Sequence, residues 1–342
     1  CGAFGAIGGD VTSMIINPAG ISVFNGNNAS LAFQARNTNY LTTYYNNSLT
    51  TEEDFFKVTN AGVVLTFENN FNNKWSKLAM GVNYRISADF EDRFIAKGNS
   101  GFSSFDRFPL DTNENPIIYN ISEDQELSNY YNGEVSELNF AFSGVYEEKL
   151  HVGAGLNFYD ISFSQQTILR ETNNDGNDNI LNSRFYQENF TNGVGFSLST
   201  GFIYKPTNTF RFGLSYQSPT WFTEIIENTN IINNDGFFGD TEIEVSNSDV
   251  IYDNTFDGNL PIQELLYKLR TPSKITASTA IIFGKIGLIS FDYSTNNYKG
   301  LYLSGDDFSQ ENLFFDNLLR RADAMRFGTE WRINNLSVRG GY

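Results

Sequence analysis

The chain has 342 residues, among them 32 Phe, 18 Tyr and 29 Gly, and its formal net charge is −17. This length allows two ordinary domains or one large β-structure, and aromatic residues scattered among polar ones favour half-buried strands. The negative charge excludes nucleic-acid binding, which requires a basic surface. Cys1 is the single cysteine, so a disulfide framework is excluded. Cys1 is either a lipidated terminus or the start of a truncated record. We favour truncation, because the sequence starts with neither an initiator Met nor a signal peptide.

Residues 1–27 form the first predicted unit, and they do not alternate between apolar and polar positions. The stretch GGDVTSMIINPAGISVF is interrupted by Asn17, Pro18, Ala19 and Gly20. Asn17 suits a helix N-cap and Pro18 the first helical position, although Pro18 and Gly20 also fit a tight turn. Because the segment is too apolar for a tail in water, we expect it to lie inside the structure formed by residues 28–342.

Strict alternation follows from residue 28 onward. In LHVGAGLNFY, for example, Leu150, Val152 and Leu156 face one side, and His151 and Gly153 the other. Ten strands are predicted, at roughly 28–45, 59–68, 74–96, 136–147, 149–170, 193–205, 208–227, 271–284, 286–303 and 323–333, and an eleventh starts at Asn335.

The connections distinguish a membrane barrel from a soluble sandwich. Short turns (68–74, 147–149, 205–208, 284–287 and 332–335) alternate with long loops near 46–58, 97–135, 171–192, 229–270 and 304–322. Aromatic residues lie beside both sets. This pattern predicts an all-β, transmembrane, antiparallel up-and-down β-barrel. An open edge is not stable in lipid, so we expect further strands after the C-terminal end. The chain lacks 18 consecutive apolar residues, which excludes a transmembrane helix.

Three sets of residues are candidates for binding. Inside the barrel, an Arg in a partly dry site suits a carboxylate, and the candidates are Arg85, Asn83, Arg211 and Arg326. A structural ladder of ion pairs is the alternative reading. In the third strand, alternation breaks at Ser87, Ala88, Asp89, Phe90 and Arg93, which indicates a kink or the point where the strand leaves the membrane. In the loop 229–270, Ile262, Leu265, Leu266 and Leu269 share one helical face, as an outer capture groove or a lid.

The N-terminal stretch GAFGAIGGDVTSMIINPAGISVF and the hairpin TPSKITASTAIIFGKIGLISFDY (271–293) resemble the FadL/OmpP1/TodX family of outer-membrane transport proteins. The Asn-Pro-Ala motif is similar to the family's hatch, in the Gly-rich form of its Bacteroidetes members. The resemblance implies a 14-stranded barrel with about 10–11 strands present here, and a hatch inside the lumen. It also implies a Gram-negative outer-membrane location, with short turns in the periplasm and long loops outside.

The function that this resemblance implies is passive transport of hydrophobic small molecules, with long-chain fatty acids as the leading candidate. The implied route is capture on outer loops, binding in the lumen, a hatch shift and lateral exit at the third strand into outer-membrane lipid. A monomer without a cofactor or metal is expected. The chain has one His, and it contains neither a G-x-S-x-G motif nor a P-loop, so an enzyme is not expected. The alternative is a structural or protein-secretion-associated barrel that acts through protein partners.

Overall fold

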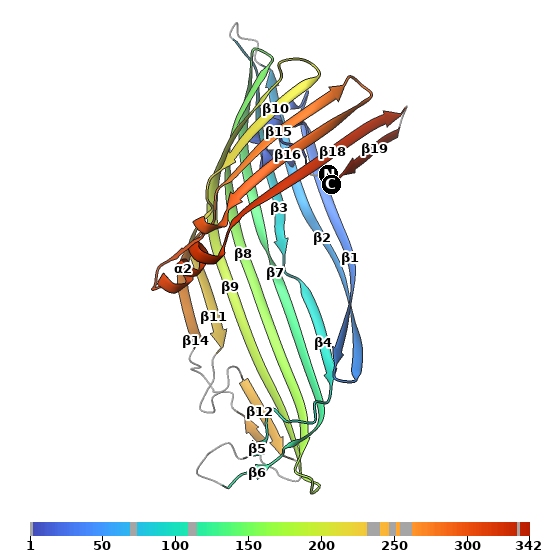
Figure 1. The fold of residues 1–342 in the computed structure, drawn as a ribbon, viewed down its shortest axis with the longest axis vertical. Helices are drawn as coiled ribbons and strands as arrows, with labels where there is room; N and C mark the ends of the chain where they lie inside the picture. Colours follow the sequence, from blue (N-terminus) through green and yellow to red (C-terminus); the bar gives the residue numbers. More distant parts are fainter. Residues whose placement is uncertain are drawn as a thin grey trace.

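The computed structural model describes residues 3–68, 74–108, 115–230, 240–245, 251–253, 262–333 and 336–342. Two short helices come first, α1 (Ser13–Ile16) and the 3-10 helix η1 (Pro18–Val23). Strands follow, and seventeen of them form one sheet. Figure 1 shows a tall, curved sheet of antiparallel strands. The antiparallel all-β architecture predicted from alternation is therefore confirmed.

The sheet is built from arms that each pair with the next arm along the chain. In order they are β1 (Asn28–Tyr44), β2 (Asn47–Glu68), β3 (Trp75–Asp89) with β4 (Asp92–Gly98), β7 (Ile121–Tyr146), β8 (Leu150–Asn174), β9 (Ile180–Tyr204), β10 (Phe210–Gln217) with β11 (Trp221–Asn230), β14 (Ile262–Arg270) with β15 (Lys274–Phe283), β16 (Gly287–Asn297) with β17 (Tyr302–Ser304), β18 (Arg321–Ile333) and β19 (Leu336–Gly341). These pairings make the predicted up-and-down order. Within the described residues, β1 pairs only with β2 and β19 only with β18.

The remaining elements are smaller. β5 (Arg107–Phe108) and β6 (Ile117–Ile118) pair with each other, and β12 (Asp240–Val245) pairs with β9 and with β13 (Ile251–Asp253). The helices η2 (Tyr298–Gly300) and α2 (Ser309–Leu318) lie between β16 and β18 along the chain. Neither α1 nor α2, the α-helices of the described residues, is long and apolar enough to cross a bilayer.

β2, β7 and β9 are much longer than predicted, and several of the predicted long loops are wrong. β7, β8 and β9 have 25 or 26 residues each, whereas a tilted strand needs about 9–11 to cross a membrane. The predicted loop 46–58 is a tight hairpin, and much of 97–135 and 171–192 is paired strand. These segments looked like loops because both of their faces are largely polar. The end with the turns 147–149 and 284–286 is called the short-turn end below, and the opposite end the far end.

An apolar band surrounds the outer face near the short-turn end. On β8 the outward side chains are apolar from Leu150 to Phe158 and, apart from Ile168, polar from Asp160 onward. Exposed large apolar side chains on the other arms complete the band: Leu31, Phe33, Val63, Leu65, Phe67, Leu78, Met80, Val82, Leu138, Phe142, Val194, Phe196, Leu198, Phe202, Phe210, Phe212, Leu214, Ile275, Ile289, Met325 and Phe327. A continuous apolar surface of this extent belongs in lipid.

Aromatic pairs mark the short-turn edge of the band. The rings of Trp75 and Tyr146 lie 5.4 Å apart, and those of Phe283 and Trp331 lie 5.7 Å apart. Amphipathic rings at the end of an apolar band are typical of a membrane–water interface. The far ends of β7, β8 and β9 therefore project out of the membrane on the opposite side.

The boundary of the apolar band can be tested on a single strand. Leu156→Arg places a charge on the outward face of β8 within the band, and we expect it to lower the free energy of unfolding by about 2–4 kcal/mol. Ile168→Arg, on the same face but beyond Asp160, is the matched control and should have little effect. Urea unfolding of both variants in lipid vesicles measures the difference. Equal effects of the two substitutions would contradict the assignment of the band.

Candidate functional site

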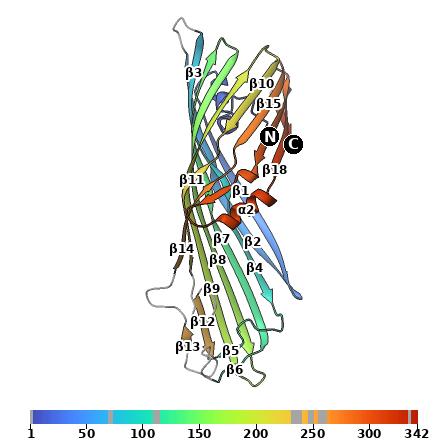
Figure 2. The same ribbon diagram turned by 60° about the vertical axis from the view of Figure 1, so that its left-hand side comes forward.

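The N-terminal segment, residues 3–24, lies against the inner face of the sheet toward the short-turn end. Figure 2 shows this blue segment enclosed by the strands near β10 and β15. It contacts the arms from β2 to β18: Val11 reaches β2 at Gly62, and Ala3 reaches β18 at Gly328. The segment therefore spans the interior from one side of the curved sheet to the other.

Glycines on the strands make room for the segment. A Cβ added to Gly153 would lie 2.4 Å from the backbone N of Ala19, and one added to Gly213 would lie 2.4 Å from the carbonyl O of Gly5. We call the set of such positions the glycine layer; it consists of Gly62, Gly81, Gly153, Gly201 and Gly213, each of which would place a Cβ within 2.7 Å of the segment. The wall is therefore shaped to hold the backbone of the segment in direct contact.

Asn17 fastens the centre of the segment. Its Oδ1 accepts a hydrogen bond from the Ala19 backbone N at 3.1 Å, which caps η1, and Pro18 takes the first helical position as predicted. Its Nδ2 donates to the carbonyls of Gly5 at 2.8 Å and Phe202 at 3.0 Å. Asn17, Pro18, Ala19 and Gly20 are all buried. The motif thus joins the two halves of the segment to each other and to β9.

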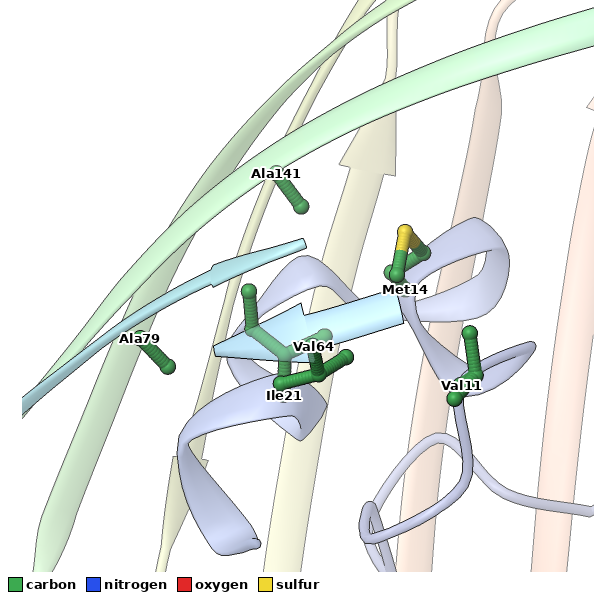
Figure 3. Close-up of a cluster of buried hydrophobic side chains, with 6 residues drawn as sticks. All are labelled: Val11, Met14, Ile21, Val64, Ala79 and Ala141. Carbon is green, nitrogen blue, oxygen red and sulfur yellow. The ribbon is translucent and has the colours of Figure 1, made fainter. Parts of the chain in front are cut away.

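A small apolar cluster supports the segment on the side of β2, β3 and β7. It consists of Val11, Met14 and Ile21 from the segment, and Val64, Ala79 and Ala141 from the sheet. Figure 3 shows these six side chains gathered between the helical turns of the segment and the strands behind them. Together with Asn17, this cluster makes the segment a packed part of the fold.

A belt of polar side chains crosses the interior next to the segment, on its far-end side. Asn60 donates to Asn83 at 2.9 Å, Asn139 donates to Asn157 at 2.9 Å, and Asn157 donates to Ser197 at 3.1 Å. We call it the polar girdle; its members are Asn60, Asn83, Arg85, Glu137, Asn139, Asn157, Tyr159, Ser197 and Gln217. The girdle links six neighbouring arms by hydrogen bonds.

Glu137 is the centre of the girdle, and its side chain is 1% exposed. It accepts hydrogen bonds from Arg85 Nε at 2.7 Å, from Asn139 Nδ2 at 2.7 Å and from the Tyr159 hydroxyl at 3.1 Å. Asn83, predicted to bind a ligand, instead bridges Asn60 and Asn139. The described contacts of Arg85 and Asn83 are therefore those of the structural ladder considered above.

The structure divides the predicted cations into two groups. Arg326 lies on the far-end side of the segment, donates to Ser294 at 3.3 Å and, with Arg85, acts electrostatically on Lys274. Arg211 lies on the short-turn side, where it donates to the Ile7 carbonyl at 2.7 Å. Arg85 and Arg326 therefore share one compartment, and the N-terminal segment separates Arg211 from them.

Apolar and aromatic side chains form the next layer toward the far end. Phe163 stacks edge-on against Phe90 at 5.4 Å, and Phe222 lies 6.1 Å from Tyr159. Phe222 and Ile225 are 7% and 2% exposed. We call this the aromatic layer; it consists of Phe90, Tyr131, Phe163, Phe222 and Ile225. An apolar interior of this kind is uncommon in a barrel, whose lumen is usually polar.

The wall is interrupted beside the aromatic layer. The register of β3 on β7 shifts between Ile86 and Ala88, and β3 ends at Asp89. The ladder between β2 and β3 stops at the pair Asn60 and Arg85, and no described ladder joins the outer half of β2 to β4. The break in alternation thus coincides with a break in the ladder. Across β7, this break is level with Ser162 on β8, where the outward residues are already polar.

Side chains close this interruption. Lys57 Nζ on β2 lies 3.2 Å from Asp89 and 2.9 Å from Glu91, and Thr51 accepts a hydrogen bond from Ile95 N at 3.2 Å. On the other side, Ser87 donates to the Val135 carbonyl, and the Phe90 N donates to the Gly133 carbonyl. Arg93 lies over the Tyr130 ring at 4.9 Å. We call this region, residues 47–59 of β2 facing residues 86–98, the seam.

The predicted helix that carries Ile262, Leu265, Leu266 and Leu269 is wrong. Residues 262–270 form β14, which pairs with β11. Leu265 and Leu269 face one side of the strand, and Leu266, which is 52% exposed, faces the other. The side chain of Ile262 is outside the described residues. Ladder bonds with β11 outweighed the helical spacing, because apolar positions three and four apart are ambiguous in a short segment.

The predicted long loop 304–322 contains the helix α2. α2 places Leu313, Phe314 and Leu318 on its surface, and each is more than half exposed. Figure 2 shows α2 projecting from the side of the sheet at mid-height. It is an exposed apolar surface that lies outside the strands.

Sequence reasoning missed the glycine layer and the contacts of Glu137. The glycines were visible as small residues at inward positions of successive alternating strands, such as Gly153, Gly201 and Gly213. A repeated absence of side chains at one level predicts that something else fills the space there. Glu137 gave no such signal, since one Glu in an alternating strand does not reveal what it faces.

Comparisons with known proteins add three solved structures. No protein-family model matches the chain, and no curated protein does so. The Ralstonia pickettii toluene transporter TbuX is 17% identical over 100% of this chain and 82% of its own, with a TM-score of 0.44. The Pseudomonas putida toluene transporter TodX is 13% identical over 99% and 81%, with a TM-score of 0.43. A Pseudomonas aeruginosa FadL homologue is 12% identical over 98% and 76%, with a TM-score of 0.47.

These three structures are two toluene transporters and a FadL homologue, each less than 20% identical to this chain. What those proteins carry is a property of theirs. For the present chain, the inner layers and the outer apolar band are the observations from which a function is argued.

Proposed function

We propose that this chain belongs to an outer-membrane β-barrel that transports hydrophobic small molecules passively, and that long-chain fatty acids are among them. The single observation that carries the proposal is the aromatic layer inside a barrel wall. Phe90 and Phe163 pack against each other from two arms, and Phe222 from a third arm packs against Tyr159, so apolar rings line the interior beside the girdle. An interior lined in this way favours an apolar passenger over water and ions.

In this proposal residues 1–27 are the hatch and residues 28–342 the barrel. The glycine layer supports this division, because the strands are shaped around the segment. We propose that the short-turn end faces the periplasm and that the far end projects outside the cell. Exposed Leu313, Phe314 and Leu318 of α2 are the candidates for first capture, in place of the helix expected at 262–269.

The carboxylate of a fatty acid is proposed to bind the cations beside the girdle. Arg85 is already paired with Glu137, whereas Lys274 lies in the field of Arg85 and Arg326, which Glu137 and Asp292 oppose. A carboxylate would bind beside Lys274 and Arg326 while its tail lies in the aromatic layer. The seam at residues 87–93 is the proposed lateral gate, and it opens at the outer edge of the apolar band.

The aromatic layer provides the test of the proposal. Phe163→Glu places a charge beside Phe90 and Tyr131, and we expect it to reduce uptake of radiolabelled oleate by at least about tenfold, since an unpaired charge in this layer repels an apolar chain. Uptake is measured in cells of a Gram-negative strain that lacks its own fatty-acid channel.

Ser164→Glu is the matched control, because it adds the same charge to the outward face of the same strand. Its uptake should equal that of the unsubstituted protein. Equal uptake by Phe163→Glu, at equal amounts of folded protein in the outer membrane, would refute a passage through the aromatic layer.

The alternative function, a structural or secretion-associated barrel, has one observation in its favour. The polar girdle is hydrogen-bonded across six arms, and such a network closes the interior between the aromatic layer and the segment. A barrel that acts only through protein partners would keep this closure permanently. If oleate uptake is normal while the girdle stays hydrogen-bonded, the passenger leaves through the seam before it reaches the girdle. That result would favour transport over the alternative function.

A further inference from the structure

Three cations lie inside the barrel on the short-turn side of the N-terminal segment. They are Lys77 on β3, Lys205 after β9 and Arg211 on β10. Each stands two positions along the chain from an inward residue of its arm, namely Ala79, Ile203 and Gly213. All three are partly buried. In the described part of the chain, none of them forms an ion pair with a carboxylate, although the protein carries a net charge of −17.

The only histidine lies at the same level. His151 is 3% exposed, and its Nδ1 is 2.8 Å from the hydroxyl of Ser22. Its Nε2 is buried and has no hydrogen-bond partner among the described residues. His151 is opposite Val145 on β7, and Val145 is opposite Lys77 on β3, so the imidazole and the ammonium group share one level of the wall.

Backbone carbonyls of the segment are the present partners of two of these cations. Lys77 Nζ donates to the Phe24 carbonyl at 2.7 Å, and Arg211 donates to the Ile7 carbonyl at 2.7 Å. A carbonyl is neutral, so these bonds leave the positive charges uncompensated. A cleft of about 240 Å³, whose charged lining is Arg211, Lys285, Glu330 and Arg332, adjoins the site on the side of Arg211 and provides room for a small group.

We propose that Lys77, Lys205 and Arg211, together with Nε2 of His151, form an oxyanion-binding site on the short-turn side of the N-terminal segment. A carboxylate or a phosphate compensates the three charges and accepts the hydrogen bonds that carbonyls now accept. Occupancy therefore competes with Phe24 and Ile7 and loosens both ends of the segment. The site itself is independent of the proposed function; only the identification of the anion as a passenger's head group rests on it.

Lys205 makes the site sensitive to pH. It lies in the turn after β9, and burial, followed by the charges of Arg211 and Lys77, lowers its pKa to about 8, with Glu148 acting weakly in the opposite direction. A bound anion favours the protonated ammonium, so affinity is highest below pH 8 and declines as the pH rises through that value. With its proton on Nε2, the neutral ring of His151 donates to the oxyanion while Nδ1 accepts a hydrogen bond from the Ser22 hydroxyl.

Calorimetric titration of the full chain in a non-ionic detergent tests the site at pH 7, with sodium decanoate, decanol and inorganic phosphate as separate probes. We expect decanoate to bind and Lys205→Met to weaken it by about tenfold or more, because one charge-assisted contact is lost. Lys149→Met removes the same charge from an exposed turn at the same end and should leave the affinity unchanged. Lys205→Arg should retain most of it.

Hydrogen exchange separates a local site from a general surface effect. Decanoate should speed amide exchange in residues 18–24 of the unsubstituted protein and leave it unchanged in Lys205→Met. If phosphate binds and speeds exchange in residues 18–24 whereas decanoate does neither, the oxyanion-binding site is supported. In that case the site gives no support to the proposed transport of fatty acids. Equal decanoate binding by the unsubstituted protein and Lys205→Met, or faster exchange in both, would overturn the site.

Discussion

Gly153→Val is expected to displace the N-terminal segment and make the barrel conduct ions. The new Cβ would lie 2.4 Å from the Ala19 backbone N and 2.5 Å from the Pro18 carbonyl C, and neither backbone atom can move without undocking η1. Overpacking of this kind costs about 1–3 kcal/mol, which shifts the docked population by about 5- to 150-fold. Conductance across planar lipid bilayers measures the result.

Ala154→Val is the control, since Ala154 is the next residue on β8 and faces the apolar band. It should fold and remain as closed as the unsubstituted protein. If Gly153→Val also fails to conduct ions, and amide hydrogen exchange in residues 18–24 is unchanged, then the segment is not held by contact with the glycine layer.

Arg85→Met is expected to lower the free energy of unfolding by about 3–5 kcal/mol, because it leaves the carboxylate of Glu137 buried without its cation. Glu137 is 1% exposed and retains only Asn139 and Tyr159 as donors in this variant. The double variant Arg85→Met/Glu137→Gln removes the charge and should recover most of the loss. Urea unfolding in lipid vesicles measures all three proteins.

Lys97→Met provides the comparison for a surface pair. Lys97 lies 2.9 Å from Asp124, and both side chains are more than two-fifths exposed, so its loss should cost about 0–1 kcal/mol. Similar losses for Arg85→Met and Lys97→Met would show that the girdle does not depend on a buried charge.

The strands of the apolar band were predictable from the sequence. β1, predicted at 28–45, spans Asn28–Tyr44, and the short turns after Tyr146 and Phe283 lie where predicted. The band alternates strictly because one face meets lipid and the other meets the segment. Before Glu134 on β7 both faces are polar or mixed, so period-two reasoning began that strand only at 136, although the ladder with β8 runs from Ile121 and Asn174.

The candidate site was only partly predictable. Asn17 and Pro18 were identified from capping preferences, which depend on neighbouring residues along the chain. The separation of Arg211 from Arg326 was not, because it depends on where the segment crosses the interior. The seam beside Asp89 was suggested by its broken alternation, but Lys57, which bridges it from β2, is about thirty residues away in the sequence and has no local signature.

Mass spectrometry of organic extracts from the purified protein in mild detergent, followed by titration with oleate, tests the central claim most directly. The account predicts a stoichiometric bound lipid and saturable oleate binding that Phe163→Glu abolishes. A correctly folded protein that carries no lipid and does not bind oleate would contradict transport of hydrophobic molecules, and it would favour the barrel that acts through protein partners.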